Sequence, residues 1–190
     1  LDFPGSKHRD YYLKILSKEK IDQQDNITVC QHDSYLQLKE YFKHLNITKV
    51  FSCANYTYDK MEDIEIVSMP YINIHECNNT CKDVLVSFLG SITHDVREKI
   101  KQSIINPNII FRDTYHISTN FSKTNKIKEE KEYIDLLSRS RFSLCPRGSN
   151  PNTVRFWESL AAGAIPVLIS DDYALPSWDW DNTIIRISEK

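Results

Sequence analysis

Two arginines and a glutamate stand close together in one stretch of this chain, next to a glycine. Arg147 and Gly148 occupy a polar loop, and Arg155 and Glu158 follow in a segment of helical character. Guanidinium groups bind phosphate through paired hydrogen bonds, and the open amides of a helix N-terminus favour anions. A carboxylate three residues beyond Arg155 lies on the same helix face and can accept hydrogen bonds from ribose hydroxyls. These residues predict a site for a phosphorylated ligand.

Both arginines also have purely structural interpretations. Arg147 could be a surface charge or could pair with Asp171 or Asp172 across the sheet edge. Arg155 stands in a first helical turn, where the macrodipole disfavours a cation, so its partner is either Glu158 or a diphosphate. We favour a ligand for Arg147, because Gly148 lets a ligand approach the backbone closely and Pro146 stiffens that approach. We favour a ligand for Arg155 as well, because a cation placed against the macrodipole suggests an anionic partner.

The elements that must position these residues are two strands and a helix. Apolar residues 142–145 predict a buried strand, and residues 146–151 form a loop rich in Pro, Gly and Asn. An amphipathic helix follows over about 152–162 and ends at Gly163, before a second apolar strand at 165–169. A strand–helix–strand unit of this kind has parallel strands, which places the loop at the carboxyl edge where ligands bind.

Two segments resemble a known family. The stretch CPRGSNPNTVRFWESLAAGAIPVLISDDYALP, residues 145–176, is similar to the signature of the exostosin-type glycosyltransferases, glycosyltransferase family 47. That signature has a C-P-R-G segment, a helix with an Arg and a Glu three apart, a small-residue turn and an I-P-V strand. Upstream, VSFLGSITHDVREKI, residues 86–100, resembles the segment that opens the nucleotide-sugar half of the same family. The matches stand in the right order, and the span from the start of the first to the end of the second, residues 86–176, is roughly half of the chain.

The resemblance implies a donor site built from both segments. It makes Arg97 a third candidate for a diphosphate contact, beside Arg147 and Arg155. It also implies that Glu158 contacts the ribose or the base. The expected donor-binding residues are Gly90, Ser91, Arg97, Arg147, Gly148, Ser149, Asn152, Thr153, Arg155 and Glu158. Some have simpler explanations, since capping alone would account for Asn152 or Thr153 and an ordinary strand-to-helix turn for Gly90.

Sugar contacts and the catalytic base are less defined by the sequence. His94 could polarise a phosphate or the sugar, or simply cap a helix, and Asp171 and Asp172 could face sugar hydroxyls or form a turn. Inverting transfer needs a base near the acceptor hydroxyl. His32 and Asp33, after the first predicted strand, are the candidates for that base, although they also read as a helix-capping turn.

We expect no metal site, because the arginines can stabilise the departing diphosphate. The triplet Asp179-Trp180-Asp181 has the D-x-D form that binds a divalent cation in a different glycosyltransferase architecture. Here it follows the strand–helix–strand unit in a turn rich in Trp. Trp178 and Trp180 are expected to pack, or to form a surface on which a sugar stacks.

Composition excludes some function classes. A net charge of −2 argues against a nucleic-acid partner that binds through a general basic surface. The longest apolar run, residues 161–169, is too short to span a bilayer, so no transmembrane segment is expected. Cys77 and Cys81 could close a disulfide loop or remain thiols, which leaves the compartment open.

The chain is expected to form two domains of α/β class. Residues 1–75 predict a partial α/β domain on the acceptor side, and residues 76–190 a Rossmann-like parallel-sheet domain that binds the nucleotide sugar. Further strands are expected at 27–30, 49–53, 64–69, 84–89, 108–111 and 183–187, with helices over 35–45, from 93 or 94, and over 129–138. Residues 112–128 are expected to form a loop. The resemblance implies the GT-B arrangement, in which two such halves face each other.

The expected function is inverting transfer of a sugar from a nucleoside diphosphate donor to a glycan or glycoconjugate. A UDP-sugar is the implied donor, and no cofactor is required. A noncatalytic nucleotide- or carbohydrate-binding module, a degenerate half of such an enzyme, is the alternative from another class.

Overall fold

The computed structural model describes residues 25–31, 33–72, 81–114 and 123–190. The chain divides into two compact units. The smaller unit holds the chain up to Pro70 together with residues 172–178. The larger unit holds residues 71–171 and 179–190.

The smaller unit contains a three-stranded parallel sheet, in the order β1 (Asn26–Cys30), β2 (Ile47–Ser52) and β3 (Glu65–Ser68). The 3-10 helix η1 (Asp33–Leu38) and α2 (Lys39–His44) connect the first two strands. Their apolar side chains pack on the sheet around the buried residues Tyr35, Phe42 and Val50. The predicted helix over 35–45 is thus present, with its first part wound as a 3-10 helix.

A segment that follows β7 in the sequence completes the smaller unit. Tyr173 forms an antiparallel bridge with Tyr56, and the Thr57 amide donates to the Asp172 carbonyl at 2.9 Å. The Tyr173 hydroxyl also donates to the carbonyl of Cys53 at 3.4 Å. A single division of the sequence near residue 75 does not describe this return of the chain.

The larger unit contains a five-stranded parallel sheet. Its strands are β4 (Val84–Gly90), β5 (Ile109–Asp113), β6 (Ser140–Pro146), β7 (Ile165–Ile169) and β8 (Ile185–Arg186), arranged in the order β5-β4-β6-β7-β8. All four neighbouring pairs are parallel, which confirms the predicted α/β class with a Rossmann-like parallel sheet. The chain runs from β4 outward to β5 and then returns to the other side at β6. Such a reversal is a topological switch point, and α/β proteins commonly bind ligands at the carboxyl ends of the strands on either side of it, here β4 and β6.

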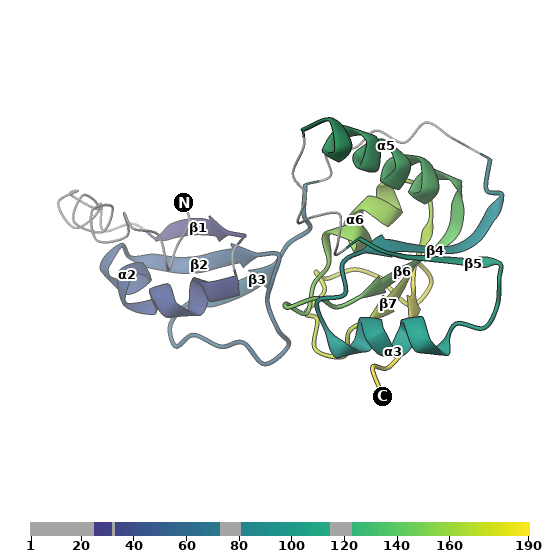
Figure 1. Ribbon diagram of the computed structural model, residues 1–190. Helices are drawn as coiled ribbons and strands as arrows, with labels where there is room; N and C mark the ends of the chain where they lie inside the picture. Colours follow the sequence, from purple (N-terminus) through teal and green to yellow (C-terminus); the bar gives the residue numbers. More distant parts are fainter. Residues whose placement is uncertain (1–24, 32, 73–80, 115–122) are drawn as a thin grey trace. The chain divides into compact units, whose positions relative to one another are not determined.

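Helices cover both faces of this sheet. Figure 1 shows α3 (Asp95–Ser103) on one face, and α5 (Lys123–Arg139) and α6 (Val154–Ala161) on the other. Val96 of α3 packs against Val167 and Ile169 of β7 in the core. Helix α6 ends at Ala161, and Gly163 follows as the predicted stop, with a φ of 66° in the left-handed region that glycine adopts without strain.

Helix α5 begins earlier than its apolar pattern predicts. Residues 112–128 were expected to be a loop, but β5 extends to Asp113 and α5 begins at Lys123, with residues 115–122 outside the described part. Lys and Glu are good helix formers even where no apolar periodicity marks them. The predicted last strand, 183–187, is shorter, with only Ile185–Arg186 in the sheet.

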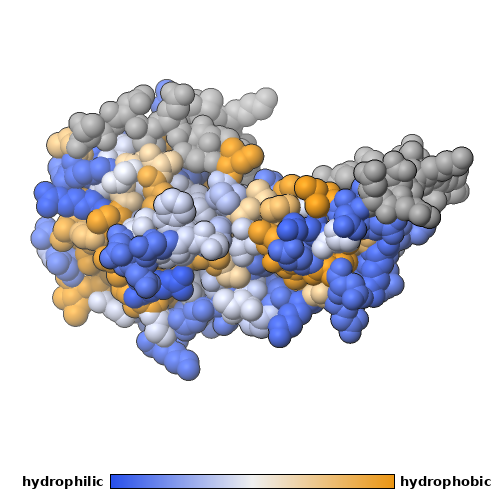
Figure 2. Space-filling view, turned by 180° about the vertical axis from the view of Figure 1, so that it is seen from behind, coloured by the Kyte–Doolittle hydropathy of each residue, from blue (hydrophilic) through white to orange (hydrophobic). Residues whose placement is uncertain are grey.

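One face of the larger unit is chemically mixed. Figure 2 shows hydrophilic and hydrophobic side chains interspersed over its visible face. In the described ranges, no helix has the length and apolar character needed to cross a bilayer.

Candidate functional site

A cavity of about 450 Å³ lies in the larger unit, where the chain leaves β6 and enters α6. Its lining residues are Tyr71, Arg97, Tyr133, Gly148, Ser149, Asn150, Asn152, Thr153, Val154, Arg155 and Glu158. Most of these residues are polar or charged, so the cavity suits a hydrophilic ligand. It draws on segments that follow β4 and β6, the two strands on either side of the switch point, and α/β proteins commonly bind ligands there.

Arg155, in the first turn of α6, has a closely confined guanidinium group. Its Cζ atom lies 4.6 Å from the ring centroid of Phe88 and 4.9 Å from that of Tyr133. Its Nη2 atom donates a hydrogen bond to the carbonyl of Leu89. A Cβ atom at Gly90 would lie 2.7 Å from this Nη2 atom, so the glycine leaves the space that the guanidinium fills. Two rings and one carbonyl therefore hold a positive charge at the cavity.

Glu158 lies one turn further along α6 and lines the same cavity. Its Oε2 atom accepts a hydrogen bond from the hydroxyl of Tyr133. Burial raises the pKa of Tyr133 above its ordinary value, and the nearby Glu158 carboxylate adds to this against the opposing charge of Arg155. The phenol is therefore a neutral hydrogen-bond donor at physiological pH. The structure thus brings together Arg155 and Glu158, as predicted, and adds Tyr133 to them.

Arg97 lines the cavity and donates three of its five N–H groups to backbone carbonyls. Its Nη1 atom donates to Ser91 at 2.6 Å, Nε to Arg147 at 2.9 Å and Nη2 to Pro146 at 3.2 Å. Burial lowers the pKa of Arg97 to about 10, with a further contribution from Arg155, so the group stays charged at neutral pH. Arg97 thereby ties the loop after β4 to the loop after β6. Its predicted contact with a diphosphate stays a prediction.

Gly148 lies close to this arginine. A Cβ atom at Gly148 would lie 3.1 Å from Arg97 Nη2 and 3.3 Å from Thr93 Oγ1. The glycine therefore allows the loop after β6 to approach α3. This close packing gives Gly148 a structural role. The predicted approach of a ligand to the same backbone stays a prediction.

Arg147 does not line the cavity. Its Nη1 atom lies 3.7 Å from Oε1 of Glu189, and its amide donates to the carbonyl of Ile169 at 3.0 Å. The sequence offered Asp171 or Asp172 as structural partners, but the ion pair is formed with Glu189 instead. Glu189 in turn accepts a hydrogen bond from the Asp171 amide at 2.9 Å. The phosphate contact predicted for Arg147 stays a prediction.

The helix-start residues predicted for the site do line the cavity. Ser149, Asn152 and Thr153 belong to it together with Val154. Thr153 is the N-cap residue of α6, yet its side chain makes no capping hydrogen bond, so capping by the hydroxyl does not explain this residue. Asn152 is buried, with 8% of its surface exposed.

The remaining predicted residues lie elsewhere. His94 is the N-cap residue of α3, and its Nδ1 atom accepts from the Val96 amide at 3.3 Å, which confirms the capping interpretation. Asp171 holds the segment after β8 by accepting from the Ser188 hydroxyl and the Glu189 amide, and Asp172 belongs to the smaller unit. Neither aspartate lines the cavity.

The two candidates for the catalytic base are not tested by the geometry. His32 lies outside the described residues, and Asp33 is the first residue of η1.

Cys77 also lies outside the described residues. The two alternatives for Cys77 and Cys81, a disulfide loop or thiols, therefore both stay untested expectations.

The D-x-D triplet forms a turn. Asp179 accepts from the Asn182 side chain at 3.2 Å and, through its carbonyl, from the Thr183 hydroxyl at 2.9 Å. The ring of Trp180 lies 5.5 Å from that of Phe156 and 5.9 Å from that of Trp157, so Trp180 packs against α6, as expected. Within the described ranges, no group of three or more His, Cys, Asp or Glu side chains could hold a metal ion.

Tyr133 is a cavity-lining residue that the sequence did not single out. The apolar pattern of its helix assigns it to the core-facing side with Ile134 and Leu137. Its hydroxyl group was the available signal, because a buried phenol needs a hydrogen-bond partner. Tyr71, Asn150 and Val154 also line the cavity without having been predicted.

Comparison with known proteins identifies the family. The Exostosin GT47 domain matches residues 62–190. An exostosin-1 homolog of Caenorhabditis elegans is 42% identical over 62 residues, which is 31% of this chain and 16% of that protein. A probable glycosyltransferase of Arabidopsis thaliana is 36% identical over 62 residues, 31% of this chain and 13% of that protein. A probable glucuronosyltransferase of rice is 40% identical over 60 residues, 30% of this chain and 14% of that protein. The matched stretch spans about a sixth or less of these relatives. Because the domain match covers more than half of the chain, the chain belongs to the exostosin GT47 family of glycosyltransferase domains.

Proposed function

We propose that the larger unit binds a nucleoside diphosphate sugar, with UDP as the nucleotide, in the cavity beside α6. The observation that carries this proposal is the placement of Arg155 and Glu158 one helical turn apart on that cavity. A guanidinium matches the charge and geometry of a phosphate, and a carboxylate accepts hydrogen bonds from a ribose. Membership of the GT47 family supports a sugar donor as the ligand.

The reaction we propose is inverting transfer of the sugar to a glycan or glycoconjugate acceptor. Arg155 and the amides at the start of α6 stabilise the negative charge of the departing diphosphate, so that no metal cofactor is required. A base accepts the proton of the acceptor hydroxyl, and His32 and Asp33 remain its candidates. In the GT-B arrangement, which we propose for the whole enzyme, such a base belongs to the acceptor-side half.

A thermal-shift titration with UDP tests the donor site. A ligand that binds only the folded protein stabilises it by RT ln(1 + [L]/Kd), so UDP should raise the Tm of the wild type. We expect Arg155→Ala and Glu158→Ala to reduce this shift strongly. Arg147→Ala should reduce it less, because Arg147 pairs with Glu189 away from the cavity lining. Arg141→Ala serves as the control, since Arg141 is exposed on β6 and does not line the cavity.

Absence of any shift with UDP and with other nucleoside diphosphates would contradict the proposal. Where the shift is present, turnover with a panel of UDP-sugars and glycan acceptors separates an enzyme from a noncatalytic binding module. UDP-glucuronic acid belongs in that panel, because relatives from rice are described as probable glucuronosyltransferases.

A further inference from the structure

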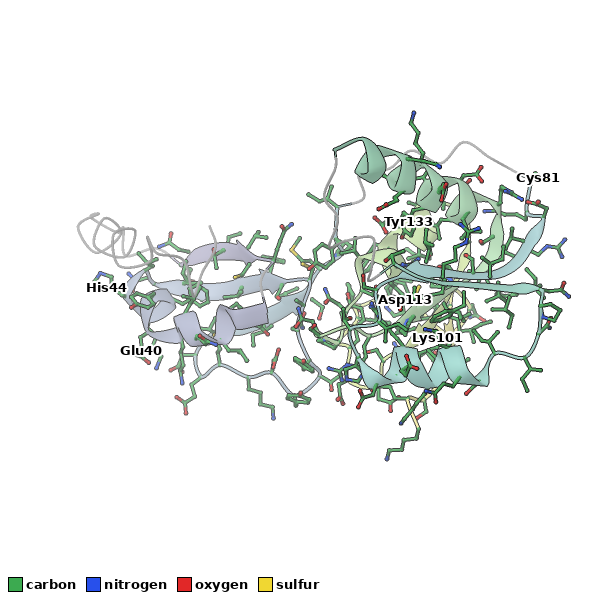
Figure 3. The ribbon with its side chains drawn as sticks, viewed as in Figure 1. Glu40, His44, Cys81, Lys101, Asp113 and Tyr133 are labelled. Carbon is green, nitrogen blue, oxygen red and sulfur yellow. The ribbon has the colours of Figure 1, made fainter. Side chains whose placement is uncertain are left out.

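Tyr133 reaches the cavity from α5, a helix that supplies none of the residues predicted for the site. Figure 3 labels this side chain where α5 faces the sheet. The hydroxyl of Tyr133 donates to Oε2 of Glu158, and its ring centroid lies 4.9 Å from Cζ of Arg155. One side chain therefore contacts both residues that we place against the donor nucleotide.

We propose that Tyr133 is the positioning residue of the nucleotide site, with its ring orienting the phosphate-binding Arg155 and its hydroxyl orienting the ribose-binding Glu158. This inference rests on the proposed function and deepens it. The tyrosine does not touch the reacting atoms. It acts through two neighbours, and the two parts of its side chain act on different parts of the ligand.

The ring confines the guanidinium. Arg155 lies between Phe88, with its centroid at 4.6 Å, and Tyr133, and one hydrogen bond to Leu89 fixes its distal end. An arginine side chain held in this way has already lost rotamer freedom before the ligand arrives, so less free energy is spent on ordering it during binding. Loss of the Tyr133 ring would open one side of this arrangement.

The hydroxyl orients the carboxylate. Glu158 can rotate about several bonds, and a donated hydrogen bond to one of its oxygens selects one orientation of the group. The phenol keeps its proton at neutral pH, so this donor is present under assay conditions. Removal of the hydroxyl alone would leave the ring on Arg155 and release only Glu158.

Two variants and two probes separate these roles. Tyr133→Phe keeps the ring and removes the hydroxyl, whereas Tyr133→Leu removes both. The probes are UDP, which carries a ribose, and inorganic pyrophosphate, which does not. We expect Tyr133→Phe to weaken UDP binding about fivefold to tenfold and pyrophosphate binding less than about twofold in calorimetric titrations. Tyr133→Leu should weaken both ligands by about tenfold or more.

The experiment includes a control variant and a check that each variant is folded. Tyr58→Phe removes a hydroxyl from an exposed tyrosine of the smaller unit and should leave both affinities unchanged. Circular dichroism checks that each variant is folded. Titrations are carried out well below the Tm of each variant, so that a loss of stability does not look like a loss of affinity. Should Tyr133→Leu fail to fold, the contrast between UDP and pyrophosphate in Tyr133→Phe still decides.

The outcomes are distinct. Equal weakening of UDP and pyrophosphate by Tyr133→Phe would indicate a merely structural role and overturn the inference. Wild-type affinities in both Tyr133 variants would overturn it while leaving the proposed donor site intact. A wild type that binds neither probe would overturn the proposed function, and the inference with it.

Discussion

Arg147 and Glu189 form an ion pair between two largely buried side chains. Their Nη1 and Oε1 atoms lie 3.7 Å apart, and the side chains are 13% and 16% exposed. Glu189 also accepts a hydrogen bond from the amide of Asp171 and donates its own amide to the Asp171 carboxylate. The pair therefore joins the segment after β8 to the loops that follow β6 and β7.

Glu189→Gln should destabilise the larger unit, because it removes the charge opposite a buried arginine while keeping an oxygen for the Asp171 amide. We expect a loss of about 1–2 kcal/mol in the free energy of unfolding, measured in urea by tryptophan fluorescence. The matched control is Glu132→Gln, because Glu132 lies at the same 3.7 Å from Arg112 but both side chains are about half exposed or more. That change should stay within about 0.5 kcal/mol. Equal effects of the two variants would contradict the structural role of the Arg147 pair.

Elements around the site were predictable where they carry a strong local signal. The apolar run at 165–169 predicted the bounds of β7 correctly, and Gly163 predicted where α6 stops. Helix α5 was predicted too short, since its first turns carry Lys and Glu instead of an apolar pattern. The order of the strands and the return of residues 172–178 depend on contacts between distant segments, which local patterns do not encode.

The site itself was predictable in part for the same reason. Arg155 and Glu158 share a helix, so their spacing alone places them on one face. The partner of Arg147 could not be read from spacing, because Glu189 lies after a further strand. Tyr133 was missed because an apolar helix pattern does not distinguish a core tyrosine from one whose hydroxyl reaches a carboxylate.

Arg97→Met should strongly destabilise the larger unit. Methionine keeps a long apolar side chain but removes the donors that satisfy the carbonyls of Ser91, Pro146 and Arg147. Because hydrogen bonds from a charged group each contribute about 1.5–3 kcal/mol, we expect a loss of about 3 kcal/mol or more in urea unfolding. Arg141→Met is the control, since the exposed Arg141 donates from Nε to the carbonyl of Lys82. Similar losses in both variants would show that Arg97 does not link the two loops.

Alkaline pH should destabilise the fold through Cys145. Burial raises the pKa of this thiol from an ordinary value near 9 to about 11. Between these values the unfolded chain releases the proton and the folded chain keeps it, so stability is full below pH 9 and falls as pH rises. The slope is about 1.4 kcal/mol per pH unit for one proton. We expect the Cys145→Ser variant to lose this contribution to the slope of the free energy of unfolding against pH, measured from pH 8 to 11. Identical slopes in the wild type and the variant would show that Cys145 does not cause the loss of stability.

Gly90→Ala should impair the site more than the fold. The added Cβ atom would lie 2.7 Å from Arg155 Nη2 and 3.2 Å from Phe88 Cζ, so the guanidinium must leave its place between the rings. The end of an arginine moves at little cost to the fold, but we expect UDP affinity to fall about tenfold in calorimetric titrations. Gly163→Ala should show the reverse, a loss of about 1 kcal/mol in stability with unchanged UDP affinity, because its φ of 66° strains any other residue. Parallel effects of the two substitutions on affinity would mean that the position of Arg155 does not control nucleotide binding.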